Sequence, residues 1–88
     1  MHEGITKYVN LNLDLGTSSY TGVKSTYDEL KQAIDEKALI IAGGLTNTGY
    51  DMTPVAAWAN YNQATADIVL LYNTVAFTFH SDGTATHT

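Results

Sequence analysis

Two histidines near the carboxyl end are the residues best suited to bind a metal ion. His80 and His87 flank Ser81-Asp82-Gly83, which predicts a tight hairpin turn because glycine accepts the positive φ that such turns require. If Asp82 and Gly83 form a two-residue turn, residue 80 faces residue 85 and residue 78 faces residue 87, so both imidazoles lie on one face. A metal site needs a third ligand, from Asp82, from another segment or from a second copy. We therefore expect solvated surface histidines, with a metal site as the alternative, and no cofactor.

The remaining polar residues lack the arrangements that catalysis requires. Asp35 and Glu36 are neighbours on a predicted helix, so their carboxylates point in different directions and do not share a site as an acid and a base would. No serine lies in a G-x-S-x-G elbow, and the glycines complete neither phosphate-binding pattern, G-x-x-x-x-G-K or G-x-G-x-x-G. We therefore expect a protein that is not an enzyme.

Three aromatic residues are candidates for contact with a partner. Tryptophan and tyrosine combine a large apolar area with a polar tip and are enriched in interfaces. Trp58 and Tyr61 border a predicted loop, and Tyr50 lies beside the loop Asn47-Thr48-Gly49. These three side chains are our candidates to contact a protein partner or a glycan, and packing in the core is the competing expectation for a domain this small.

The composition restricts both the partners and the size of the core. The 88 residues suffice for one domain, and so short a domain without cysteine gains stability by associating with copies of itself. Nine acidic residues outnumber four lysines, and the absence of arginine further argues against nucleic acid as a ligand. No apolar run approaches the ~20 residues that span a bilayer, and the start does not resemble a signal peptide. We therefore expect no membrane insertion.

The first elements are predicted to be a strand and a helix. Residues 8–15 alternate apolar and polar side chains, which indicates a strand with one buried face, followed by a turn at residues 16–19 and a short strand at 20–23. Thr26 and Glu29 match a capping box, which places the start of the helix at Thr26 and Asp28 near the positive end of its dipole. An apolar stripe follows at helical spacing: Tyr27, Leu30, Ala33 and Ile34.

The middle of the chain contains one clear strand and one ambiguous segment. The apolar run 38–42 stops at Gly43-Gly44, which is typical of a strand buried on both faces. Residues 50–66 fit a helix, because Thr53-Pro54 is a good helix start and alanines follow, or a strand, because apolar and polar positions alternate from Val55. We prefer the strand, with residues 60–63 as the loop that follows it.

From Asp67 the pattern is an antiparallel meander. Strands are predicted at residues 68–72 and 75–79 with a turn at Asn73-Thr74, and residues 84–88 pair back after the turn at Gly83. The predicted fold class is α+β, with one helix packed on an antiparallel-rich sheet in the order β-(β)-α-β-β-β-β and a single domain over 1–88.

This order of elements resembles small domains in virion fibre, head-fibre and tail-associated proteins of phages that infect gut bacteria. The motifs that carry the resemblance are Ser25-Thr26-Tyr27-Asp28-Glu29-Leu30, Ala38-Leu39-Ile40-Ile41, Thr53-Pro54-Val55 and Phe77-Thr78-Phe79-His80-Ser81-Asp82-Gly83-Thr84. The resemblance implies a structural or adhesive role in a homo-oligomer, often a trimer, and no catalytic residues.

The expected function is therefore a non-enzymatic structural or adhesive module of a phage particle, in a fibre, a decoration or a host-attachment surface. Its location would be the virion, and the host cytoplasm during assembly. Its partners would be copies of itself, other virion proteins or the host surface. The alternative is a small acidic phage-encoded inhibitor that binds a host defence protein, which a monomer that co-purifies with one host protein would favour.

Overall fold

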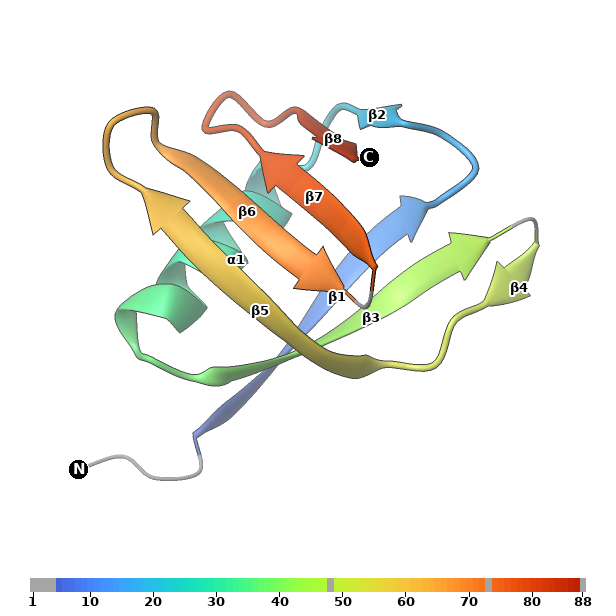
Figure 1. Cartoon of the computed structure of the whole chain (residues 1–88), viewed down its shortest axis with the longest axis horizontal. Helices are drawn as coiled ribbons and strands as arrows, with labels where there is room; N and C mark the ends of the chain where they lie inside the picture. The colour runs from blue at the N-terminus through green and yellow to red at the C-terminus, as the bar shows by residue number, and fades with distance from the viewer. Residues whose placement is uncertain (1–4, 48, 73, 88) are drawn as a thin grey trace.

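The computed structural model describes residues 5–47, 49–72 and 74–87, in which one helix packs against a curled sheet (Figure 1). The helix is α1 (Lys24–Asp35). The strands in chain order are β1 (Thr6–Asp14), β2 (Ser19–Tyr20), β3 (Leu39–Asn47), β4 (Tyr50–Asp51), β5 (Val55–Asn62), β6 (Asp67–Tyr72), β7 (Val75–Phe79) and β8 (Ala85–His87). The predicted α+β fold class is confirmed.

The sheet follows the order β1-β3-β5-β6-β7-β8-β2, with β4 attached to β3. The meander predicted from Asp67, β6 to β8, is antiparallel throughout, and β5 joins it by antiparallel pairing with β6. By contrast, β1 and β3 are parallel and are joined through α1, the kind of crossover that parallel neighbours require. β1 and β2 are consecutive in the chain yet lie at opposite ends of this order. The sheet curls between them, so that the Tyr20 hydroxyl on β2 donates a hydrogen bond to the carbonyl oxygen of Asp14 on β1, at 2.7 Å.

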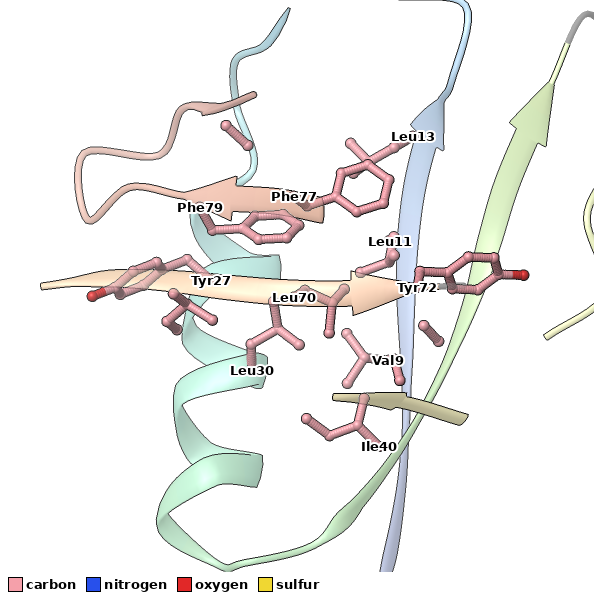
Figure 2. Packing of buried hydrophobic residues seen from close by; sticks show 14 of the residues in the cluster. Val9, Leu11, Leu13, Tyr27, Leu30, Ile40, Leu70, Tyr72, Phe77 and Phe79 are labelled. Atoms are coloured by element: carbon pink, nitrogen blue, oxygen red, sulfur yellow. The ribbon is translucent and has the colours of Figure 1, made fainter. Parts of the chain in front are cut away.

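The core lies between α1 and the inner face of the sheet (Figure 2). The predicted apolar face of β1 and the predicted stripe of α1 both belong to this core, because Val9, Leu11 and Leu30 are at most 1% exposed. The other strands contribute Ile40, Ala42, Leu45, Ala57, Ile68, Leu70, Tyr72, Phe77, Phe79 and Ala85. Two buried tyrosines keep their hydroxyls paired: Tyr72 donates to the Thr53 carbonyl oxygen at 2.6 Å, and Tyr27 donates to that of Ala66.

The helix begins earlier than the capping box predicted. Val23 is the N-cap residue and has no side-chain cap, so Thr26 is the third helical residue and is buried. The cause is tertiary: the Val23 side chain is only 8% exposed, and its N–H donates to the Gly83 carbonyl oxygen at 2.9 Å. The contact with the β7–β8 loop therefore fixes the start of α1, and no acidic residue lies in its first turn, contrary to the prediction for Asp28.

β3 is longer and less buried than predicted. The strand passes through Gly43 and Gly44 to Asn47, and Leu39 at its start is 48% exposed, so it is not buried on both faces. Gly44 has φ +71° opposite a register shift between Asn10 and Leu13 of β1. The glycine thus accommodates a bulge instead of ending the strand.

Residues 50–66 contain the strand that we preferred, but its loop lies further on than predicted. β5 continues through residues 60–62, and the turn occupies 63–66, where the Asn62 carbonyl oxygen accepts from the Ala66 N–H at 2.7 Å. The predicted strand at 20–23 is shorter and earlier, at Ser19–Tyr20. Tyr72 pairs with Val75 as the predicted turn between β6 and β7 requires, while Asn73 and Thr88 lie outside the described residues.

Candidate functional site

The two histidines lie on opposite faces of the β7–β8 hairpin, which corrects the prediction that they share one face. Phe77 pairs with His87, and the His80 N–H donates to the Thr84 carbonyl oxygen at 2.8 Å, so the loop holds three residues and Gly83 has φ +90°. A register shift of one residue exchanges the faces of a strand. His87 consequently lies on the inner face, with its ring centroid 5.5 Å from that of Phe77.

His80 pairs with a carboxylate on the outer face. Its Nδ1 lies 2.9 Å from Oδ1 of Asp67, which is the residue at the start of β6. Within the ranges that the structure describes, no group of three or more histidine, aspartate or glutamate side chains is placed to hold a metal ion. The pair therefore joins the adjoining ends of β6 and β7.

Several large apolar side chains lie on the side of the sheet away from α1. We call this group the outer apolar face and define it by Tyr8, Leu39, Ile41, Trp58 and Leu71. Ile41 is half-buried, and the other four side chains are 44–67% exposed. The patch contains no charged side chain.

The strand register brings these residues together from four strands. Tyr8 on β1 pairs with Ile41 on β3, and Ile41 pairs with Ala56 on β5. Two residues along β5, Trp58 pairs with Leu71 on β6. Because residues opposite one another in neighbouring strands project to the same face, these side chains from β1, β3, β5 and β6 all lie on the outward face of the sheet.

Gly43 leaves room for the Tyr8 ring to lie over the backbone of β3. A Cβ on Gly43 would lie 2.0 Å from the Tyr8 hydroxyl oxygen and 2.6 Å from the ring carbon that carries it, so the Tyr8 ring lies directly over the bare backbone of β3. One side of the ring thereby covers β3, and the other side is accessible to solvent, since Tyr8 is 54% exposed. A larger residue at position 43 would displace this ring.

A small cleft adjoins the patch at Trp58. It has a volume of about 300 Å³ and lies between the end of α1 and the strands β3 and β5. Its walls are mainly apolar and consist of Ile34, Lys37, Ala38, Leu39, Ile40, Ala57, Trp58 and Ala59. Trp58 and Leu39 therefore belong both to the outer apolar face and to the wall of this cleft.

The three predicted contact residues do not form one site. Trp58 is 67% exposed on the outer face and Tyr50 is 75% exposed on β4, whereas Tyr61 is half-buried on the opposite face of β5. There the ammonium of Lys31 lies 4.6 Å from the Tyr61 ring centroid. The pKa of Lys31 is raised chiefly by its hydrogen bond to Asp35. Trp58 and Tyr61 separate because neighbouring odd and even positions of a strand alternate between faces.

Sequence reasoning missed four members of the outer apolar face: Tyr8, Leu39, Ile41 and Leu71. Each of the four lies on a strand whose alternate positions supply the core. The alternation within one strand, such as that of Tyr8, shows only that the residue points outward together with several other residues of the same strand. The useful signal is an apolar side chain at the outward positions of several strands. That signal becomes informative only when the strand order is known.

No protein-family model, curated protein or solved structure matches this chain. Across the described residues, the structure has no helix with the length and apolar character needed to cross a membrane.

Proposed function

We propose that the chain is a non-enzymatic structural or adhesive module of a phage particle, which acts as a homo-oligomer and makes its contacts through the outer apolar face. One observation carries this proposal: large apolar side chains from four strands gather in one uncharged patch on the exposed side of the sheet. Contiguous apolar patches on soluble proteins mark interaction sites. Covering the exposed part of Trp58 or Leu71 removes apolar surface from water, which contributes roughly 25 cal/mol per Å² before the cost of association is subtracted.

The composition of the patch favours a protein surface as the partner. Trp58 pairs with Leu71 and lines the cleft together with Leu39, and such a mixture of aliphatic and aromatic side chains without charge matches the buried centre of protein interfaces. The order of the elements, which resembles domains of virion fibre and tail-associated proteins, supports a phage particle as the setting. Copies of the chain and other virion proteins are accordingly the partners that we propose.

Particles purified from the phage that encodes the chain test this function. We expect quantitative mass spectrometry to find the wild-type chain in several copies per particle. Trp58→Ser and Leu71→Ser should each lower that number severalfold, because each removes an apolar contact without disturbing the core. Thr86→Ser is the matched control, since Thr86 is exposed on the same face but outside the patch.

Absence of the wild-type chain from the particles would refute the proposed setting. A copy number that Trp58→Ser and Leu71→Ser leave unchanged would show that another surface makes the contacts. A monomeric chain that co-purifies with a single host protein would support an inhibitor in its place.

A further inference from the structure

One edge of β5 is open over half of its length. β5 pairs with β3 only through Val55, Ala56 and Ala57, and with β6 only through residues 58–62. Beyond Ala57, β3 and β5 diverge (Figure 1). Residues 58–62 therefore have no strand partner on the β3 side within the described part of the chain. Because successive residues of a strand direct their N–H and C=O groups to alternate edges, this edge presents backbone groups that another strand can bind.

The space beside this edge is an open groove. Lys31, Ile34 and Asp35 of α1 line one side of it, and residues 59–63 with Val69 line the other. The groove lies next to the cleft at Trp58, whose walls share Ile34 and Ala59. A strand that added to β5 would thus lie beside α1, with the cleft at one end.

The other edges of the sheet carry features that discourage pairing. β1 contains the half-buried Lys7 on its inner side and a bulge at Asn12, which has φ +51°. β2 and β4 are only two residues long. Natural sheets use short strands, bulges and inward-facing charges to prevent unwanted pairing at an edge. β5 has no charge and no proline from Val55 to Asn62, so its open edge lacks these protections.

We propose that residues 58–62 of β5 pair in antiparallel fashion with the same residues of a second copy, so that one sheet continues through a two-fold dimer. This inference rests on the proposed homo-oligomeric function and names the contact that forms it. A two-fold axis at the middle of the segment places Asn60 of one copy opposite Asn60 of the other, and Trp58 opposite Asn62.

The chemistry of the segment fits a second copy. A net charge of −5 on each chain opposes association in general, but this segment is uncharged and therefore does not repel itself. The carboxamide of Asn60 both donates and accepts hydrogen bonds, which makes a pair of such side chains self-complementary. The pairing also places Trp58 of both copies on the same side of the joined sheet, at opposite ends of the paired segment.

Charged substitutions at the axis test this arrangement. Asn60→Lys places two ammonium groups opposite one another and Asn60→Asp places two carboxylates, so we expect each variant alone to dimerise several times more weakly than wild type in sedimentation velocity. An equimolar mixture of the two variants should restore a dimer, because opposite charges then face each other. Thr86→Lys and Thr86→Asp are the controls: Thr86 is exposed on the same face, on a strand paired on both sides.

Hydrogen exchange supplies a second measurement that does not depend on any variant. Within residues 58–62 of the wild type, the amides that face away from β6 should become more protected as protein concentration rises, while the amides that face β6 and those of β7 stay unchanged. A wild type that remains monomeric, with the amides on the open edge unprotected, overturns the pairing and leaves the edge to a strand of another protein. An oligomer insensitive to charge at position 60 also overturns it. Absence from phage particles would refute the proposed function alone and leave the dimer intact.

Discussion

At the scale of single residues, two neighbouring glycines allow β1 and β3 to approach closely. Gly43 lies beneath the Tyr8 ring, and Gly44 adopts φ +71° at the bulge beside Asn10 and Asn12. A Cβ on Gly44 would lie 1.8 Å from the Asn10 side-chain oxygen and 2.8 Å from the Asn12 backbone nitrogen. Rotation of the Asn10 side chain would not make enough room for this Cβ, because the Asn12 nitrogen belongs to the backbone of the sheet.

Gly44→Ala should therefore destabilise the protein more than an alanine at another positive-φ glycine. Gly22 has the same φ of +71°, but a Cβ at that position would meet no atom within 4 Å. Gly22→Ala should lower the free energy of unfolding by about 1 kcal/mol, from the left-handed backbone alone. Gly44→Ala should lower it by about 3 kcal/mol, because a clash adds to that strain. Urea denaturation of both variants measures the difference, and equal losses would show that the bulge yields without cost.

At the scale of elements, the loop between β7 and β8 is held by a carboxylate. Asp82 Oδ1 accepts hydrogen bonds from the Thr84 hydroxyl at 2.6 Å and from the Thr84 N–H at 3.0 Å. These bonds, the hydroxyl first, lower the pKa of Asp82 below its ordinary value of 3.8. The folded state thus favours the charged carboxylate. Its contribution to stability is present above pH 3.8 and is lost as the pH falls through the lowered pKa.

Removing the hydroxyl should return this carboxyl toward its ordinary behaviour. In Thr84→Val we expect the pKa of Asp82 to rise toward 3.8, because the shortest hydrogen bond to the carboxylate is gone while the backbone one remains. An NMR titration of the Asp82 carboxyl carbon measures the change. Ser81→Ala serves as the control, since it removes the neighbouring exposed hydroxyl. An identical pKa in Thr84→Val and wild type would assign the shift to the backbone.

Elements with a simple period could be predicted, and those shaped by distant contacts could not. Alternation in residues 8–15 and from Val55 identified β1 and β5, because one face of each meets the core. The start of α1 was not predicted because it depends on the hydrogen bond from the Val23 N–H to the carbonyl oxygen of Gly83, sixty residues further along the chain. The register at His80 escaped it because a three-residue loop and a two-residue loop share the same Asp-Gly sequence.

At the scale of the whole molecule, the strand order creates both candidate surfaces. The outer apolar face exists only because β1, β3, β5 and β6 are neighbours, and the open edge exists only because β3 leaves β5 after Ala57. Trp58 could be singled out by its residue type, but its companions Leu39 and Leu71 come from strands that no local pattern places beside it. The periodicity of the sequence does not predict that β1 and β3 pair in parallel.

Tyr20 closes the curl of the sheet and joins its two ends. Its hydroxyl donates to the carbonyl oxygens of Asp14 and Thr17, and its ring lies 6.0 Å from that of His87 and 6.4 Å from that of Phe77. Burial raises the pKa of the Tyr20 phenol above its ordinary value of 10.0, and the hydroxyl is protonated at neutral pH with or without this shift. One side chain therefore links the end of β1 to β2 and β8.

Tyr20→Phe should lower the free energy of unfolding by about 1 kcal/mol through loss of the hydroxyl bonds. Tyr20→Ala should lower it by about 3 kcal/mol, because the ring contacts are lost as well. Hydrogen exchange should show which part of the sheet is destabilised. In Tyr20→Ala we expect the amides of β2 and β8 to exchange faster while those of β5 and β6 keep their protection, because β2 and β8 can open while the rest of the sheet stays folded. Equal acceleration in β5 and β6 would show that the curl opens only with the entire fold, so that closure of the sheet and formation of the core are one cooperative event.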